Sequence, residues 1–369
     1  MHKNFRIIIY FLFLAFFIFS CDPAPENEST PETGDKDFTN LDSVLELLRG
    51  EFNFVGLSLA VVRDDRLVYA QSYGYSDMEN SIPAAASDIY RIASVSKLIT
   101  AVAIFKLVEE GIIALDEKVF GAGSIFGDDY GTPGTHVSDI TVRHLLEYGS
   151  GFTDGGSGST IAERISSRAA IDLPNPPGTI YDYKNIDYII LGRIIEKVTG
   201  FGYEKYLQDT VLLSCGITNM AIGTGERRSG EVKYYTPSGP LAISSLAMSD
   251  SAGGWTAAAS DLARFFVRIN RSQIKEDILS STYTTYTQTP AAFGVSNLPP
   301  FQNSIWNYFG DMAGTRAVMS RLDDRTGFVL LVNTSLTGND NYGFYVQQAR
   351  IGIALRKIIV WPSHDLFEE

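Results

Sequence analysis

A serine and a lysine three positions apart are the most reactive pair of residue types in this sequence. They lie in the run Ser94-Val95-Ser96-Lys97. If this run opens a helix, both side chains lie on one face, about one turn apart. A lysine within hydrogen-bond reach can accept the proton of a serine hydroxyl when burial or a neighbouring charge lowers the pKa of its amine. The N–H groups of a helix N-terminus favour the negative charge that then develops. The pair therefore outlines a serine nucleophile that needs no histidine.

The spacing alone is weak, because a chain of this length contains about one Ser-x-x-Lys by chance. Ser272 and Lys275 have the same spacing, in a polar stretch. Ser94 is instead followed by an apolar segment, residues 98–108, whose pattern predicts a buried helix. The spacing alone favours a structural interpretation, with Ser94 as a small residue at a helix start and Lys97 as a solvated charge.

A second group that could carry chemistry is Tyr183-Lys184-Asn185. A phenol in a dry cleft beside a cationic lysine can titrate low enough to shuttle protons. An asparagine two residues on could hydrogen-bond both the lysine and a substrate carbonyl. The group follows Pro177-Gly178-Thr179 and precedes an apolar helix at 186–198. A loop tyrosine packed on that helix, with the asparagine as its cap, is an equally open interpretation.

Composition narrows the classes of protein to consider. The chain has 369 residues, of which 45% are hydrophobic, enough to bury the core of one large domain or two lobes. Its formal net charge of -13 argues against a nucleic acid partner and against a basic membrane-binding surface. The histidines form no metal-binding motif, so we expect neither a metal ion nor a cofactor. They are scattered at His2, His136, His144 and His364.

The first residues have the pattern of a targeting segment. Lys3 and Arg6 precede an apolar stretch at 7–19, which ends just before Cys21. This resembles a bacterial lipoprotein signal, with residues 1–20 as the signal peptide and Cys21 as the lipid-bearing residue. An ordinary signal peptide with an incidental cysteine is the alternative. Residues 21–37 are acidic and proline-rich, which predicts a disordered tether. We therefore expect a cell-envelope protein that contacts the membrane through its N-terminal lipid only.

Hydrophobic patterning beyond residue 37 predicts an α+β fold. Strands at both ends of the chain surround a helical, loop-rich middle, which indicates an antiparallel sheet built from both chain ends. The expected sheet lobe comprises about 38–93 and 240–369, and the helical lobe about 94–239. Within the domain at 38–369, the expected helices are 38–48, 261–270 and 342–359, and the expected strands are 57–62, 67–73, 305–310, 317–322 and 328–333.

Together these segments resemble the serine β-lactamase and penicillin-binding-protein family, in its class C-like branch of esterases, amidases and D,D-peptidases. The likeness spans about residues 40–355 and includes the Ser-x-x-Lys signature. It implies a β-lactamase/D,D-peptidase-like fold. The segments that look like family landmarks occur in the expected order: Gly56 to Val62, Tyr90 to Lys97, Ile140 to Leu146, Pro177-Gly178-Thr179 and Ala252-Gly253-Gly254-Trp255.

The resemblance also implies roles for individual residues. In the family the serine of the first motif is acylated and the lysine accepts its proton, which carries over to Ser94 and Lys97. The Tyr-x-Asn motif carries over to Tyr183, as acid and base for the leaving group or the attacking water, and to Asn185, as a substrate-orienting amide. His144 falls in a helix that is structural in the family, so we expect it to pack rather than to react.

The third family motif is where this sequence departs from the pattern. The family usually has Lys-Thr-Gly or His-x-Gly on a strand that lines the cleft. The segment matched to it here is 310–314, which puts Asp311 at the cationic position and Ala313 at the glycine. Ala313 or Gly314 would then supply one oxyanion-hole N–H and Ser94 the other. A carboxylate in place of a cation should disfavour substrates with a terminal carboxylate and raise the pKa of the nearby amine and phenol.

Two functions remain open from the sequence. The first is an acyl-transfer hydrolase that uses Ser94, Lys97 and Tyr183 on an ester, amide, β-lactam or D-amino-acid peptide. The second is a catalytically impaired, penicillin-binding-like module that binds a cell-envelope peptide or glycan. A Ser-His-Asp hydrolase on another fold is disfavoured, because the chain has no Gly-x-Ser-x-Gly elbow.

Overall fold

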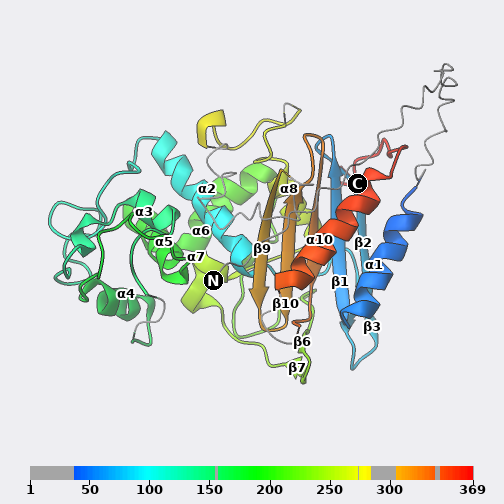
Figure 1. The fold of residues 1–369 in the computed structure, drawn as a ribbon, viewed down its shortest axis with the longest axis horizontal. Helices are drawn as coiled ribbons and strands as arrows, with labels where there is room; N and C mark the ends of the chain where they lie inside the picture. Colours follow the sequence, from blue (N-terminus) through cyan, green and yellow to red (C-terminus); the bar gives the residue numbers. More distant parts are fainter. Residues whose placement is uncertain (1–36, 154–156, 273, 284–304, 337–340, 369) are drawn as a thin grey trace, which may run out of the picture. The chain divides into compact units, whose positions relative to one another are not determined.

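A computed structural model describes residues 37–153, 157–272, 274–283, 305–336 and 341–368 (Figure 1). Its main sheet has the strand order β3-β2-β1-β11-β10-β9 and is antiparallel throughout. The strands are β1 (Gly56–Arg63), β2 (Arg66–Asp77), β3 (Ile82–Pro83), β9 (Trp306–Met312), β10 (Thr315–Arg321) and β11 (Thr326–Val332). Because β1 pairs with β11, the sheet joins the two ends of the domain.

Helix α1 precedes the sheet strands along the chain and α10 follows them, and the other helices and short strands lie between β3 and β9. The helices are α1 (Thr39–Glu51), α2 (Ser96–Glu109), α3 (Val142–Leu146), α4 (Ile161–Ala169), α5 (Asn185–Thr199), α6 (Tyr203–Leu207), α7 (Asp250–Gly253), α8 (Ala259–Phe266) and α10 (Asn341–Arg356). The short strands are β4 (Tyr90–Arg91), β5 (Ala221–Ile222), β6 (Tyr234–Thr236), β7 (Gly239–Leu241) and β8 (Trp255–Ala257), which pair as β4-β8-β5 and β6-β7.

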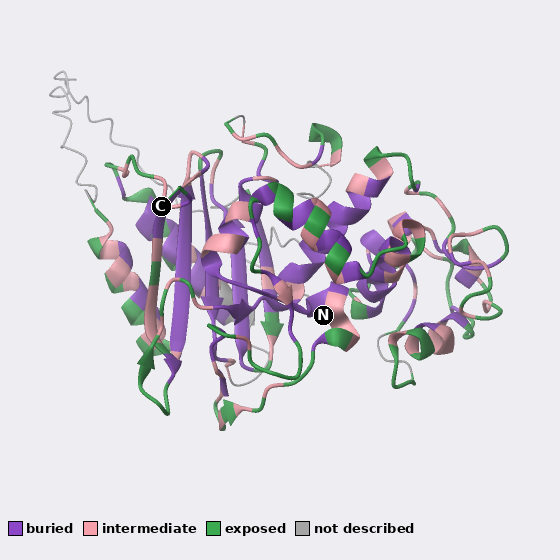
Figure 2. Cartoon of the chain, turned by 180° about the vertical axis from the view of Figure 1, so that it is seen from behind, coloured by how far each residue is buried: buried purple, intermediate pink, exposed green. Residues whose placement is uncertain are grey.

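The sheet separates two hydrophobic clusters. Helices α1 and α10 cover one face, where the residues of β1 that point toward them include Leu59 and Val61. The other face packs against α8 and is continuous with the core around α2 and α5. The strands in the middle of the sheet are therefore buried on both sides, as their colouring in Figure 2 shows. Continuous apolar runs such as that of β11 are typical of strands covered on both faces.

Local sequence explains the tightest connection in the sheet. Strands β1 and β2 are joined at Asp64 and Asp65, whose φ angles are 52° and 57°. Aspartate tolerates this left-handed region better than most residues, and two such residues in a row form the hairpin turn whose twist matches that of the strands. The hairpin that the sequence predicts is therefore present.

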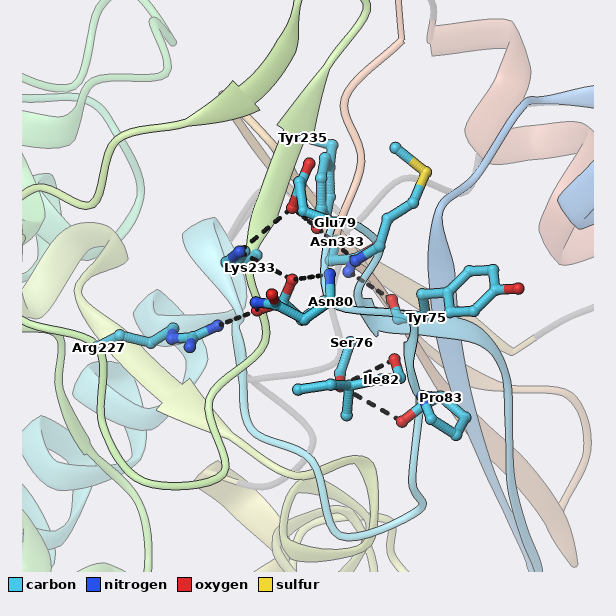
Figure 3. Close-up of polar contacts among 12 residues, drawn as sticks. Tyr75, Ser76, Glu79, Asn80, Ile82, Pro83, Arg227, Lys233, Tyr235 and Asn333 are labelled. Carbon is cyan, nitrogen blue, oxygen red and sulfur yellow. Dashed lines mark hydrogen bonds and ion pairs between the residues drawn. The ribbon is translucent and has the colours of Figure 1, made fainter.

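A buried carboxylate fastens the end of β2 to the middle of the chain. Asp77 is 2% exposed, and one of its oxygens accepts a hydrogen bond from Lys233 Nζ at 2.8 Å. Lys233 also contacts Glu79, which accepts a hydrogen bond from the Tyr235 hydroxyl (Figure 3). Asn80 completes the turn by donating to the second oxygen of Asp77. This network holds the start of β6 against the end of β2, near the edge of the sheet that β3 forms.

The structure confirms the predicted α+β fold, with its antiparallel sheet from both chain ends. The observed elements differ from the predicted bounds by a few residues, as for β9, which continues to Met312. The proposed signal peptide, Cys21 and nearly all of the tether lie outside the described residues, so these assignments remain predictions. Within the described parts of the chain, no helix combines the length and hydrophobicity that a membrane span requires.

Candidate active site

Ser94 lies in a tight turn that leads directly into the buried helix α2. Residues Ala93–Val95 form a single 3-10 turn, and α2 continues from Ser96. The φ angle of Ala93 is 46°, an uncommon value for a residue with a side chain. Strained backbone of this kind persists where the surroundings hold it in place, and it gathers at functional sites. The turn leaves the Ser94 side chain partly exposed while its neighbours are buried.

Lys97 is fully buried, and its amine lies within hydrogen-bond distance of three oxygen atoms. Nζ lies 3.1 Å from Ser94 Oγ and 2.8 Å from Asn185 Oδ1. It lies 2.7 Å from the carbonyl oxygen of Ala252. The amide oxygen and the carbonyl can only accept hydrogen bonds. A neutral amine can satisfy both with its two hydrogens and still direct its lone pair at the Ser94 hydroxyl.

Tyr183 approaches the same serine from the other side. Its hydroxyl donates to Ser94 Oγ over 2.8 Å, and its ring lies 4.8 Å from Lys97 Nζ. The structure therefore brings Ser94, Lys97, Tyr183 and Asn185 together, although the last two are almost ninety residues along the chain from the first two. Lys184, between Tyr183 and Asn185, is turned to an ion pair with Asp182 at 2.8 Å.

The loop before Tyr183 is shaped by two glycines. Gly178 has a φ of 80°, and a Cβ there would lie 3.0 Å from His144 Nε2. Its N–H donates to the carbonyl of Gly149, and the N–H of Asp182 donates to the carbonyl of Tyr148. These contacts explain the Pro-Gly-Thr landmark, because only a residue without a side chain lets the loop lie this close to α3.

His144 has the structural role that the sequence predicts. The N–H of Thr141 donates to its Nδ1 at 3.1 Å, and the Thr141 hydroxyl accepts from the N–H of His144, so the two residues form a capping box on α3. Burial lowers the pKa of the imidazole below its usual value of 6.5. The ring is therefore neutral and acts as an acceptor in this cap.

The segment from Ala252 to Trp255 forms the floor beneath the serine and lysine. Besides the Ala252 carbonyl, the N–H of Trp255 donates to Ser96 Oγ at 3.2 Å. A Cβ at Gly254 would lie 2.6 Å from the Cα of Asp250, so this position excludes a side chain. The landmark thus consists of backbone contacts that fix α2 and its turn in position.

Strand β9 runs beside the serine, and Gly310 is the residue at the closest approach. A Cβ on Gly310 would lie 2.3 Å from the carbonyl oxygen of Ile92 and 3.1 Å from the Ser94 nitrogen. The strand is at the end of the described sheet, so its outward N–H groups have no strand to pair with. The stretch around Gly310 can therefore present backbone donors next to the N–H of Ser94.

This geometry differs from the sequence-based alignment of the third motif. Gly310, rather than Ala313, takes the glycine's place beside Ser94. Ala313 and Gly314 instead form the turn that joins β9 to β10, where Met312 pairs with Thr315. Side chains alternate along a strand, so a shift of three residues changes both the position and the face of each one.

Asp311 consequently does not lie at the cationic position. Its neighbour Phe309 contacts Tyr345 of α10, so alternation places Asp311 on the α10 face and not on the Ser94 face. Arg316, on the neighbouring strand β10, pairs directly with Asp311 and shares that face. Burial raises the pKa of the Asp311 carboxyl, and the charge of Arg316 partly offsets this. With Gly310 as the glycine of the motif, the cationic position lies two residues earlier and is occupied by Tyr308.

Buried tyrosines form a wall beside Tyr183, and the sequence analysis did not find it. The Tyr148 ring lies 4.7 Å from that of Tyr183 and 5.3 Å from that of Tyr188. Tyr148 has a φ of 56°, a second strained backbone position at the site. Tyr308 comes from β9 and lies close enough to Tyr148 for each to influence the pKa of the other. These three residues, Tyr148, Tyr188 and Tyr308, are called the tyrosine wall below.

The second Ser-x-x-Lys is unrelated to the site. The Ser272 hydroxyl accepts a hydrogen bond from the N–H of Ile274, two residues along the chain. Lys275 Nζ lies 3.8 Å from an Asp365 carboxylate oxygen and over the ring of Phe367. The lysine is thus directed at the C-terminal segment, as expected for a chance occurrence of the spacing.

Comparison with known proteins agrees with this geometry. A family model described as Beta-lactamase matches residues 41–349, which include every site residue named above. The chain belongs to the Beta-lactamase family. The family assignment and the fold that the sequence predicts are therefore confirmed.

Curated relatives match over part of their length. Penicillin-binding protein 4* of Bacillus subtilis (strain 168) is 29% identical over 209 residues, which cover 53% of this chain and 44% of the relative. Protein flp of Staphylococcus aureus (strain MRSA252) is 28% identical over 197 residues, which cover 51% of this chain and 39% of the relative. The matched region thus spans less than half the length of these relatives.

Solved structures share the fold over most of the chain. The octameric penicillin-binding protein homologue from Pyrococcus abyssi superposes with a TM-score of 0.74 at 24% identity, covering 87% of this chain and 78% of that one. The D-amino acid amidase from Ochrobactrum anthropi SV3 superposes with a TM-score of 0.72 at 19% identity, covering 86% of this chain and 98% of that one.

Proposed function

We propose that this protein is a serine hydrolase that forms an acyl-enzyme on Ser94. The observation that carries the proposal is the convergence of two proton-handling groups on one hydroxyl: Lys97 Nζ and the Tyr183 hydroxyl lie 3.1 and 2.8 Å from Ser94 Oγ. A nucleophile within hydrogen-bond reach of a base that is itself held by further contacts is the arrangement that covalent catalysis requires. The substrate is an ester, an amide, a β-lactam or a D-amino-acid peptide.

The acylation step follows from the contacts of Lys97. As Ser94 Oγ bonds to the carbonyl carbon, its proton passes to the lone pair of the neutral amine. The bond to the leaving alcohol or amine then breaks, and Tyr183 donates a proton to the departing atom. Lys97 returns a proton to Tyr183, so the proton lost by Ser94 leaves with the product. Water attacks the acyl-enzyme by the same route in reverse and restores the Ser94 hydroxyl.

Two backbone donors stabilise the charge on the substrate oxygen in this proposal. One is the N–H of Ser94, and the other is an outward N–H of β9 next to Gly310. Such donors act where charge develops in the transition state, and loss of one costs about 10²–10³ in rate. Asn185 orients the substrate through its amide nitrogen, because its oxygen is engaged with Lys97.

Hydrolysis of a small panel by the full chain tests the proposal. The panel consists of a nitrophenyl ester, a D-amino-acid amide and a penicillin, each assayed with the wild type, Ser94→Ala and Ser272→Ala. The wild type and Ser272→Ala should hydrolyse at least one compound at equal rates, and Ser94→Ala none. Equal turnover by Ser94→Ala would refute the proposal. Binding of a peptidoglycan fragment without turnover of any compound would favour the non-catalytic binding module instead.

We propose the cell envelope as the location of this activity, with Cys21 as a lipid attachment site. The support is the sequence pattern before Cys21, together with relatives that are named penicillin-binding proteins. Fractionation of cells that express the full chain tests this. The wild type should sediment with membranes and Cys21→Ser should not, whereas equal sedimentation would contradict lipid attachment at this residue.

A further inference from the structure

The tyrosine wall is uncharged. Tyr148 is 1% exposed and Tyr308 is 2% exposed, and the hydroxyls of both side chains are buried. Burial raises the pKa of Tyr148, Tyr188 and Tyr308 well above the usual value of 10. All three are therefore neutral phenols around neutral pH.

Tyr308 is the member of the tyrosine wall that comes from β9, the strand beside Ser94. It stands two residues before Gly310 on β9, and alternate residues of a strand share a face. Gly310 faces the Ser94 turn, so Tyr308 points toward the same side of the sheet, where it packs near Tyr148 and Tyr183. A cation at this position would lie close to Tyr183, whose hydroxyl contacts Ser94 Oγ, and the chain places a neutral phenol there.

The lysines closest to the serine do not supply the missing charge. The Lys97 amine is directed at Ser94, Asn185 and Ala252, all within the protein. The Lys184 amine is paired with the carboxylate of Asp182. A substrate carboxylate beside Tyr183 would therefore lose its water without gaining an ion pair from either lysine, and burying a charge in this way is costly.

We infer that this site selects acyl donors that carry no carboxylate near the scissile bond, and that Tyr308 is the positioning residue that sets this preference. The inference rests on the proposed function and narrows its substrate class to neutral esters and amides. It reaches the same preference that the sequence suggested for Asp311, but assigns it to a different residue on the opposite face of β9.

A matched pair of substrates tests the preference directly. The phenylacetyl esters of 3-hydroxybenzoic acid and of methyl 3-hydroxybenzoate differ by one carboxylate on the leaving group. The wild type should have a kcat/KM at least about tenfold higher for the methyl ester, as expected for one unpaired charge. Equal kcat/KM values, or a higher value for the free acid, would overturn the inference.

Two variants assign the preference to Tyr308. Tyr308→Phe keeps a neutral ring and should keep the wild-type ratio of the two kcat/KM values. Tyr308→His introduces a group whose ordinary pKa is about 6.5 and whose pKa burial lowers, so its ratio should move toward the free acid as the pH falls from 8 to 5, whereas that of Tyr308→Phe should not. A purely structural residue would not produce a change of ratio with pH, and an unchanged ratio in folded Tyr308→His would refute its role.

The outcome separates this inference from the proposed function. If the wild type hydrolyses the methyl ester and Ser94→Ala does not, the proposed function holds and the ratio decides the inference. If the wild type hydrolyses neither ester nor any compound of the panel, both fail together. If Tyr308→His does not fold, the wild-type ratio and that of Tyr308→Phe still decide whether the site rejects carboxylates.

Discussion

At the scale of single residues, the function depends on how one hydroxyl is shared. Ser94 Oγ has Lys97 on one side and Tyr183 on the other, and Lys97 is kept in place by Asn185 and the Ala252 carbonyl. Each of these groups has a distinct task in the proposed mechanism. Removal of each group should therefore impair a different step of the reaction, and kinetic measurements can separate these steps.

Loss of the lysine should abolish acylation more completely than loss of the tyrosine. Lys97→Ala removes the base, and Tyr183→Phe removes the group that protonates the leaving atom, so we expect each to lower kcat/KM for a nitrophenyl ester by about 10²–10⁴. Tyr183→Phe should lose less on that ester than on an amide, because nitrophenolate leaves without a proton. Lys275→Ala, in the second Ser-x-x-Lys, is the matched control and should equal the wild type. An equal loss in that control would contradict the assignment.

The sequence alone predicted the residues that lie on recognisable motifs. Ser94, Lys97, Tyr183 and Asn185 could be found because each pair is fixed by local helix or loop geometry. Tyr308 could not, since its position depends on which face of β9 meets the Ser94 turn. The sequence of β9 and of the turn that follows it contains two candidate glycines four residues apart, Gly310 and Gly314. Only the close approach to the Ile92 carbonyl shows which of them is beside the serine.

At the scale of elements, the site depends on β9 and on the cap of α3. The strand approaches the Ser94 turn at a distance that only a glycine permits. The cap holds the helix against which the loop before Tyr183 packs. Both are positions where a small local change should alter activity or stability without any contact to substrate.

Gly310→Ala tests the assignment of the third motif. Its Cβ would approach the Ile92 carbonyl oxygen to 2.3 Å, so β9 or the Ser94 turn must move. We expect a loss of about 1–3 kcal/mol in the free energy of unfolding. The displaced backbone donor should lower kcat by about 10²–10³. Ala313→Ser, at the exposed turn of the same hairpin, should match the wild type in urea denaturation and in kcat. A larger loss in Ala313→Ser than in Gly310→Ala would restore the original alignment.

The neutral His144 cap predicts a dependence of stability on pH. Because the pKa of His144 is lowered in the folded protein, the unfolded chain binds this proton first as the pH falls. The contribution of the neutral His144 to the free energy of unfolding is present above about pH 6.5 and is lost progressively as the pH falls below that value. His144→Gln can still cap the helix but does not titrate. The stability of the wild type relative to His144→Gln should therefore fall between pH 7 and pH 5 in denaturant titrations, and a constant difference would contradict the neutral cap.

At the scale of the whole molecule, one sheet holds the two ends of the domain together. Strand β1 pairs with β11, more than 260 residues away along the chain. The apolar patterns of the terminal strands predicted this sheet, because alternation and continuous apolar runs are local signals. The connections through the middle of the chain were harder to predict, since they depend on backbone contacts such as those of Gly149 and Gly254.

Variants of Asp77 and Glu79 test how the end of β2 is held against the start of β6. Burial alone would raise the pKa of Asp77, but hydrogen bonds from Lys233 and Asn80 lower it to about 2. Its stabilising contribution is therefore present above about pH 4 and is lost as the pH falls toward 2. Asp77→Asn should lower the midpoint of thermal unfolding at pH 7, with a difference from the wild type that shrinks between pH 4 and pH 2. Glu79→Gln, whose side chain is 38% exposed, should have a much smaller effect at pH 7.

The most direct test of the central claim is the mass of the protein after reaction with an acyl donor. The intact full chain should gain the mass of one acyl group from a slowly hydrolysed neutral ester, or of one phosphonyl group from a fluorophosphonate. Peptide mapping should place that group on Ser94. Ser94→Ala should gain no mass, and Ser272→Ala should gain the same mass as the wild type. A modification that persists in Ser94→Ala, or the absence of any adduct together with no ester hydrolysis by the wild type, would contradict the account.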